Sequence, residues 1–161
     1  MAISKLGGTG SDNWELISSV TPTAASAAVN FTGLSVYRKL MIVFYDLVLG
    51  SSGTVSLRLN NDSTSKYMSG SSGSTGKMAT EIAISGSNTG QNGFASFIDC
   101  DTTSTKTISG GQYATYSGST PSSSAYALQG IYLASAAVSQ VNLITSTTFT
   151  AVGTVALYGV K

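Results

Sequence analysis

The densest run of apolar side chains lies between residues 36 and 60 and gives the clearest pattern in the chain. From Val36 to Leu49 apolar residues occupy both parities, so a strand there carries them on both of its faces. We expect one set to face the domain's own core: Tyr37, Met41, Val43, Tyr45, Leu47 and Leu49. The other set then has to meet a covering loop or a partner chain: Val36, Leu40, Ile42, Phe44 and Val48.

A short loop with glycine at both ends, 50–53, follows this run. The chain then returns with Val55, Leu57 and Leu59 alternating against polar residues, as in a half-buried strand. Because loops of this length commonly join antiparallel neighbours, the pattern predicts a hairpin. A helix is the rival interpretation of 36–49, since the run is long enough for one. β-Branched and aromatic residues dominate and no capping residues bracket the run, which favours the strand.

Shorter alternating segments continue to the end of the chain, and loops rich in Gly, Ser and Asn separate them about every 8 to 15 residues. This spacing predicts an all-β antiparallel fold of about eight to ten strands, either a sandwich or a barrel. The Gly110–Gly111 pair predicts a bulge or bend within a strand. We expect residues 1–13 to form an N-terminal arm and 14–161 a single domain. Further strands are predicted at 14–20, 77–85, 93–100, 106–116, 125–134, 138–144 and 149–160.

The chain is poor in charge, and this narrows its partners. It has 161 residues and a formal net charge of +1, and 9% of its residues are charged, against roughly 25% in an average soluble domain. Such a balance offers no basic patch for nucleic acid. The sequence has neither an apolar run long enough for a membrane span nor a secretory signal, so we expect synthesis in the cytoplasm. The single Cys100 is expected to be a small buried hydrophobe.

Residues that most catalytic mechanisms require are missing from the sequence. The chain has no histidine, which excludes serine-histidine and cysteine-histidine mechanisms. Asp99 and Asp101 could share a face and hold Ca²⁺ or act in acid–base chemistry, although Asp is routine in a turn such as the one that Asp101 opens. Asp46 interrupts an apolar strand, and a buried carboxylate needs a donor or a cation. We therefore expect Asp46 either to pair with an arginine such as Arg58 or to lie at the solvent-exposed end of the strand. We therefore predict no enzyme activity, no cofactor and no metal site.

Several segments together resemble a group of small virion proteins of tailed bacteriophages. They are Trp14 to Ser19 (WELISS), Val29 to Leu34 (VNFTGL), Leu57 to Asp62 (LRLNND) and the C-terminal Leu157 to Lys161 (LYGVK). The likeness spans nearly the whole chain from Trp14, and the C-terminal segment is its most characteristic part. No long N-terminal shaft precedes Trp14, which favours a compact protein that sits directly on a shell over a long fibre.

The resemblance implies a β-sandwich of jelly-roll type that acts as a capsid decoration, or cement, protein on the virion surface. It also implies self-association, commonly as a homotrimer, and binding to the major capsid protein. The residues expected to contact the capsid are Ile3, Lys5 and Leu6. Those expected at the interface between copies are Trp14, Tyr37, Met41 and Tyr45.

The alternative function is a receptor- or glycan-binding tip of a head or tail fibre, with a host surface glycan as the partner. Four tyrosines in the last third of the chain could stack on sugars, although tyrosines of sandwich domains are more often packing residues. They are Tyr113, Tyr116, Tyr126 and Tyr132.

Overall fold

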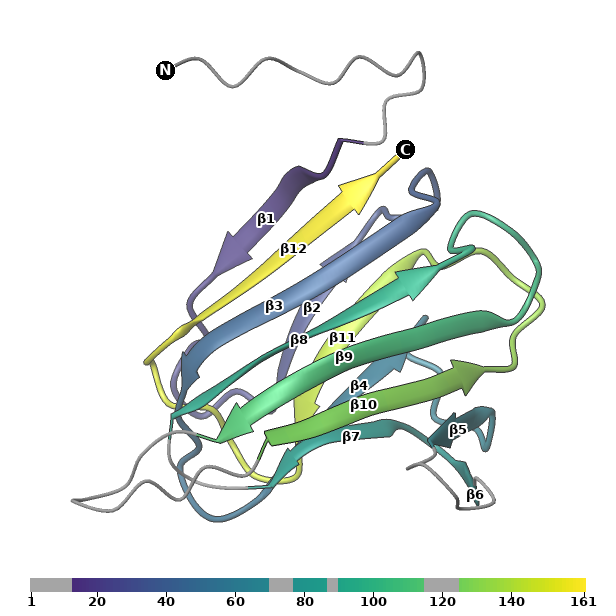
Figure 1. Ribbon diagram of the computed structural model, residues 1–161. Helices are drawn as coiled ribbons and strands as arrows, with labels where there is room; N and C mark the ends of the chain where they lie inside the picture. The colour runs from purple at the N-terminus through teal and green to yellow at the C-terminus, as the bar shows by residue number, and fades with distance from the viewer. Residues whose placement is uncertain (1–12, 70–76, 87–89, 115–124) are drawn as a thin grey trace.

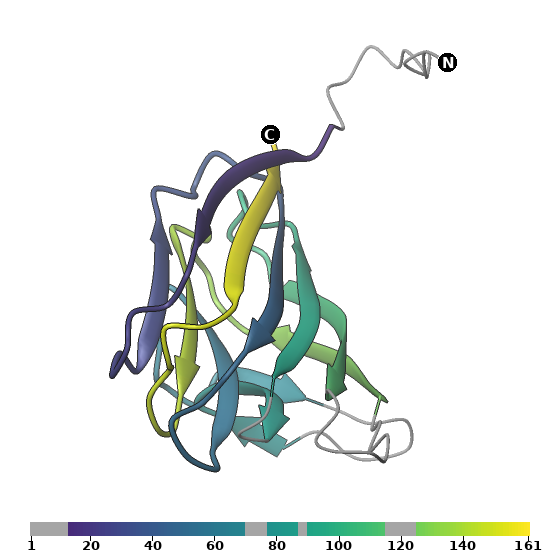
Figure 2. The same cartoon turned by 90° about the vertical axis from the view of Figure 1, so that its left-hand side faces the viewer.

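The computed structural model describes residues 13–69, 77–86, 90–114 and 125–161. In these residues it has twelve β-strands and no helix, and the strands form two antiparallel sheets packed face to face (Figures 1 and 2). The prediction of an all-β antiparallel sandwich is confirmed. The strand number exceeds the predicted eight to ten, because 77–85 forms two strands and because Ala28–Thr32 and Tyr67–Ser69, which were not predicted as strands, form strands as well.

The larger sheet has eight strands in the order β1-β12-β3-β8-β9-β10-β5-β6. Their bounds are β1 (Glu15–Val20), β12 (Thr154–Val160), β3 (Lys39–Leu47), β8 (Gln91–Ile98), β9 (Lys106–Ala114), β10 (Ala125–Tyr132), β5 (Tyr67–Ser69) and β6 (Lys77–Ala79). The smaller sheet has the order β2-β11-β4-β7. Its strands are β2 (Ala28–Thr32), β11 (Gln140–Thr145), β4 (Thr54–Leu59) and β7 (Ile82–Gly86).

The pairing follows one long antiparallel ribbon that is rolled around the core. The first strand pairs with the last, β1 with β12, and the second with the one before it, β2 with β11. Further in, β3 pairs with β8, and β4 pairs with β7. These four pairs lie alternately in the larger and the smaller sheet, so each connection crosses the sandwich. The remaining strands, β9, β10, β5 and β6, extend the larger sheet on one side (Figure 1).

The predicted hairpin across 50–53 is wrong. β3 lies in the larger sheet and β4 in the smaller one, so the loop between them crosses from one sheet to the other. Both strands carry an apolar face, and in a two-layer fold both faces reach the same core when the strands oppose each other across it. Leu57 and Leu59 are fully buried on their side, as is Ile42 on the other.

The predicted assignment of faces is wrong for residues 40–45, where the two parities are exchanged, whereas Tyr37 and Leu49 are buried and Val36 is exposed as predicted. Leu40, Ile42 and Phe44, which we expected to meet a loop or a partner, are buried in the core. Asp46 has a φ of 51° and lies where the register between β3 and β8 shifts, so the parity changes there. For this reason Leu47 faces the core as predicted, although it shares its parity with the exposed Tyr45.

Segment 77–85 forms two strands instead of one. β6 pairs with β5 in the larger sheet, and β7 pairs with β4 in the smaller one. The chain changes sheet at Thr80 and Glu81, where the Glu81 carboxylate accepts a 2.7 Å hydrogen bond from Arg58. Arg58 therefore pairs with Glu81, and the predicted partnership of Arg58 with Asp46 is wrong. Asp46 is exposed, in agreement with the other prediction for it, a place at the wet end of the strand.

The predicted bulge at Gly110–Gly111 is absent. Gly110 pairs with Ala95 on β8 and Leu128 on β10, and the register continues unbroken on both sides. A Cβ on Gly110 would collide with the carbonyl oxygen of Phe94 and come within 2.9 Å of the Ala95 Cα. Glycine at this position therefore allows β8 and β9 to approach each other closely.

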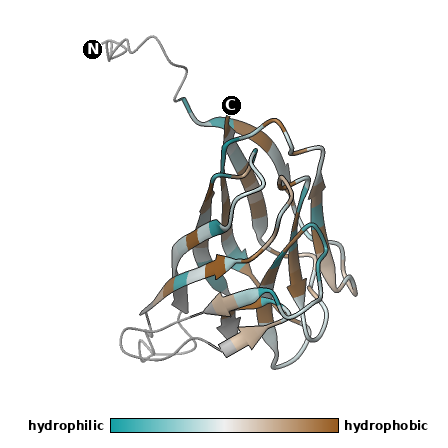
Figure 3. Cartoon of the chain, turned by 90° about the vertical axis from the view of Figure 1, so that its right-hand side faces the viewer, coloured by the Kyte–Doolittle hydropathy of each residue, from teal (hydrophilic) through white to brown (hydrophobic). Residues whose placement is uncertain are grey.

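The core lies between the sheets and is almost wholly apolar (Figure 3 shows hydrophobic and hydrophilic residues alternating along the strands). Cys100 is fully buried, as predicted. The largest fully buried side chains are Tyr67, Tyr132, Phe44, Phe97, Lys106, Phe149, Leu34, Leu40, Ile42, Leu47, Leu57 and Leu59.

Candidate interaction surface

The outward side of β1, β12, β3 and β8 forms a largely apolar surface, interrupted by Ser19, Thr154 and Ser96, which we call the outer face. Strand registers align its side chains in rows across the sheet. One row runs from Leu16 through Tyr158 to Met41. The next runs from Ala156 through Val43 to Phe94. Because alternate residues of a strand point to opposite sides, these residues face away from the core that Leu40, Ile42 and Phe44 fill.

The outer face exposes much of its apolar area. Tyr45 is 69% exposed, Leu16 56%, Ile98 42% and Phe94 40%. Scattered apolar residues are normal on a protein surface, but a contiguous group on neighbouring strands indicates a contact site. The group is also rich in aromatic residues and methionine, which are enriched where proteins bind each other.

Charge is nearly absent from the outer face. Among the described outward positions of its four strands, the charged side chains are Lys39, the first residue of β3, and the exposed Asp46, at the bulge near the end of that strand. Beyond β8 the outward residues of β9 and β10 become polar, with Thr107, Ser109 and Gln129 all exposed. The apolar surface therefore has a defined border on that side.

The outward side of the smaller sheet is different, because amide and charged groups bond across its strands. Asn142 of β11 is 2% exposed and donates a 2.6 Å hydrogen bond to the side-chain oxygen of Asn30 on β2. The backbone N–H of Asn61 donates to the Asn142 side-chain oxygen. Next to them lies the Arg58–Glu81 ion pair. Polar side chains bond to one another across this side, although the buried Arg58 Nε has no partner among the described residues, so the two sides of the sandwich differ in character.

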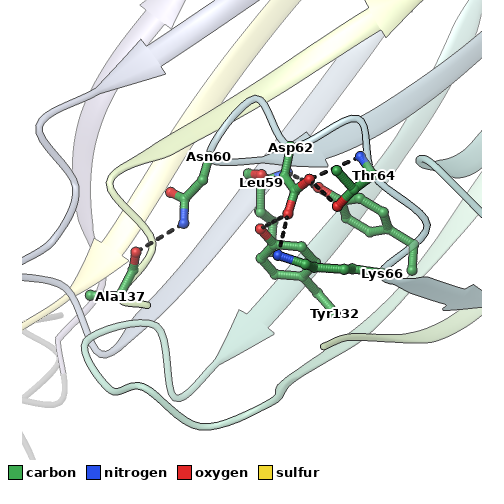
Figure 4. Close-up of polar contacts among 8 residues, drawn as sticks. Leu59, Asn60, Asp62, Thr64, Lys66, Tyr132 and Ala137 are labelled. Carbon is green, nitrogen blue, oxygen red and sulfur yellow. Dashed lines mark hydrogen bonds and ion pairs between the residues drawn. The ribbon is translucent and has the colours of Figure 1, made fainter. Parts of the chain in front are cut away.

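A polar cluster at the edge of the core, in which exposed or partly exposed loop residues meet the buried Tyr67 and Tyr132, holds the loop that follows β4 (Figure 4). The Asp62 carboxylate accepts hydrogen bonds from the Thr64 hydroxyl at 2.5 Å and the Tyr132 hydroxyl at 2.9 Å, and Lys66 lies 3.4 Å away. The Tyr132 ring stacks on Tyr67 with a centroid distance of 4.6 Å. Its burial makes Tyr132 a packing residue. The other three tyrosines that could stack on sugars, at 113, 116 and 126, have side chains outside the described part.

These contacts favour the ionised form of Asp62. The hydrogen bonds from Thr64, and after them those from Tyr132 and Lys66, lower the pKa of Asp62 from 3.8 to about 2, against a partial opposing effect of burial. The contribution of the group to stability is thus complete above the unfolded-state pKa and is lost as the pH falls toward 2.

We expect Asp62→Asn to lower the free energy of unfolding by about 1–2 kcal/mol at pH 7, because the charge-assisted hydrogen bonds are weakened. The difference between variant and wild type should shrink between about pH 4 and pH 2, where the wild-type carboxylate becomes protonated. Urea titrations at several pH values measure it. Asp101→Asn, at an exposed turn carboxylate, is the matched control and should change stability little. An Asp62→Asn effect that does not vary with pH would contradict the assignment.

The Lys106 side chain and the Cys100 thiol are both buried. The Lys106 ammonium donates to the backbone carbonyl oxygens of Thr102 and Ser104, and so closes the loop before β9. Burial lowers the pKa of Lys106 and raises the pKa of the Cys100 thiol to about 12. A thiol with so high a pKa stays protonated and is a poor nucleophile.

The structure places the predicted interface residues in two environments. Trp14, Met41 and Tyr45 lie at the surface: Trp14 is 44% exposed and shares the parity of Leu16, while Met41 and Tyr45 belong to the outer face. Tyr37 is wrong as an interface residue, because it is 9% exposed and its ring lies against Gly159, where a side chain would leave it no room. The predicted capsid-contact residues Ile3, Lys5 and Leu6 lie outside the described residues.

Sequence reasoning missed most of the outer face, namely Leu16, Val43, Phe94, Ile98, Ala156 and Tyr158. A usable signal was present in 93–98, where Phe94 and Ile98 stand on one parity and Ala95 and Phe97 on the other. As in 36–49, apolar residues on both parities indicate a strand that is apolar on both sides.

Carboxylates do not gather into a metal-binding group in the described part of the chain. Asp99 and Asp101 are both exposed, and Asp99 has a φ of 59° at the start of a turn in which its carbonyl oxygen accepts from the Thr102 amide. The described residues also contain no helix long and apolar enough to cross a membrane. The outer face offers apolar side chains for contact.

Comparison with known proteins gives no match to the chain, whether with protein-family models, with curated proteins or with solved structures.

Proposed function

We propose that the protein is a structural component of a tailed-bacteriophage virion, a capsid decoration protein that binds the mature head and stabilises it. The observation that carries the proposal is the outer face, a broad apolar and almost uncharged surface on a rigid sheet. A surface of this kind suits contact with other protein subunits. The sequence resemblance supplies the virion as the place where such contacts occur.

The finer fold assignment, a jelly roll, belongs to the same proposal. The ribbon pairs β1–β12, β2–β11, β3–β8 and β4–β7 alternate between the two sheets, which supports it. A jelly roll is a double-sheet arrangement of eight strands and is common in viral capsid proteins. On this assignment β9, β10, β5 and β6 are additions that widen the larger sheet.

The mechanism would be thermodynamic linkage. A protein that binds the assembled shell and has no affinity for its separated subunits stabilises the shell by an amount that grows with ligand concentration over the dissociation constant. The polar side of the smaller sheet then faces solvent, where its amide and charged groups keep the particle soluble. No catalytic step is involved.

The test is co-sedimentation of the purified protein with expanded phage heads that lack it, together with the melting temperature of the heads. We expect saturable binding and a higher melting temperature at saturation. Absence of binding to the heads, with the protein folded, would contradict the decoration function. Binding to host cells or surface polysaccharide in the same preparation would then support the fibre-tip alternative.

A further inference from the structure

The two ends of the outer face carry opposite charges on a single strand. Lys39 begins β3, and Asp46 lies at the bulge near its end. Neither side chain forms an ion pair within the described part of the chain. Asp46 is exposed, and Lys39 is partly exposed. Seven residues of extended chain separate the two by about 23 Å.

Everything between these charges on the outward side of β3 is apolar. Met41, Val43 and Tyr45 occupy the alternate positions from Lys39 onward. On the neighbouring strands, Tyr158 and Ala156 stand beside Met41 and Val43, and Phe94 stands on the other side of Val43. The centre of this stretch lies at Ile42, whose own side chain points into the core.

A second copy of the chain is complementary to this arrangement. Two sheets that pack face to face keep their strands within about 30° of parallel or antiparallel. A two-fold axis that passes over Ile42 makes the two β3 strands antiparallel and brings each surface against itself. Lys39 of one copy then lies beside Asp46 of the other, and this pairing occurs twice. The apolar residues between them pack against the same residues of the partner.

We propose that the outer face is the contact between two copies of this chain, related by a two-fold axis over β3 and held in register by two Lys39–Asp46 pairs. This inference rests on the proposed function in so far as both treat the outer face as an assembly surface. The family resemblance implies three copies, whereas the charge placement favours two. In the dimer the two outer faces cover each other, so the dimer would meet the shell through its remaining surface.

The size of the surface agrees with a specific but reversible contact. The outward positions from Lys39 to Tyr45 span about 20 Å along the strand, and the four strands β1, β12, β3 and β8 span about 20 Å across. Standard interfaces bury about 800 Å² on each partner, and a projected area of roughly 400 Å² on each partner is smaller than that, in the range of weak or transient contacts. Charge pairs at the rim mainly fix orientation and partner choice.

Reversing the charge at Lys39 or at Asp46 tests the inference. The molar mass of the protein in solution is measured by light scattering after size-exclusion chromatography, over a concentration series. The wild type should approach twice the 16.4 kDa of one chain. Lys39→Asp alone and Asp46→Lys alone should each dissociate at least about tenfold more readily, because each places like charges together twice. An equimolar mixture of the two variants should restore the dimer, since both contacts in the mixed pair are then attractive.

Folding is checked by far-ultraviolet circular dichroism and melting temperature. Asp46 has a φ of 51°, a conformation that asparagine tolerates better than lysine, so Asp46→Asn serves as a second variant that removes the charge and keeps the bulge. It should also weaken the dimer. A wild type that stays monomeric or forms trimers, variants whose mass equals that of the wild type, or a mixture that stays monomeric would overturn the inference. Failure to bind phage heads by an intact dimer would instead contradict the decoration function alone.

Discussion

Replacing Phe44 by alanine should lower the free energy of unfolding by about 3–5 kcal/mol, whereas Tyr45→Ala should change it by about 0.5 kcal/mol or less. Phe44 is 1% exposed and packs in the core, so its truncation removes buried contacts and leaves a cavity. Tyr45, the next residue, is 69% exposed and faces outward. Urea unfolding followed by circular dichroism, at a protein concentration low enough to keep the chain monomeric, measures both. Equal effects, or a larger one at Tyr45, would contradict the assignment of faces in β3.

The second large effect is expected at Gly110. Gly110→Ala should destabilise the fold by about 3 kcal/mol, because a Cβ there collides with the backbone of β8, which cannot move without breaking the ladder on both sides. Gly33→Ala is the matched control: Gly33 has a φ of 75°, but a Cβ there meets nothing within 4 Å. Its cost should be only the left-handed strain of about 1 kcal/mol.

Melting temperature and urea titration of the two glycine variants separate the steric clash at Gly110 from the backbone strain at Gly33. A destabilisation at Gly33 equal to that at Gly110 would mean that the close approach of β8 and β9 contributes nothing. Unchanged stability of Gly110→Ala would show that the strands stand further apart than described.

The fold class was predictable from the sequence, because alternation of apolar and polar residues has a period that only strands satisfy. Segments such as 15–20 and 125–132 form strands within the predicted ranges. Sheet membership was not predictable in this way. Whether β4 pairs with β3 or crosses to the other sheet depends on contacts with β11 and β7, which are distant in sequence. A loop such as 50–53 is compatible with either connection.

The interaction surface was predictable in part. The pattern correctly indicated a strand that is apolar on both sides, but alternation alone does not tell which parity faces inward. The bulge at Asp46 adds to the difficulty, since it moves Leu47 and Leu49 to the core side after Tyr45 has pointed outward. The burial of Tyr37 depends on Gly159, a residue at the far end of the chain. Local patterns cannot supply such a contact.

The measurement that tests the central claim most directly is sedimentation velocity of the wild type and of Phe94→Asp over a concentration series, with Ala83→Asp as the control. Phe94 belongs to the outer face, whereas Ala83 is exposed on the outward side of the smaller sheet. If the outer face is the assembly surface, the wild type and Ala83→Asp sediment as associated particles and Phe94→Asp sediments as a folded monomer. Association of Phe94→Asp equal to that of the wild type, or its loss in Ala83→Asp alone, would contradict the account.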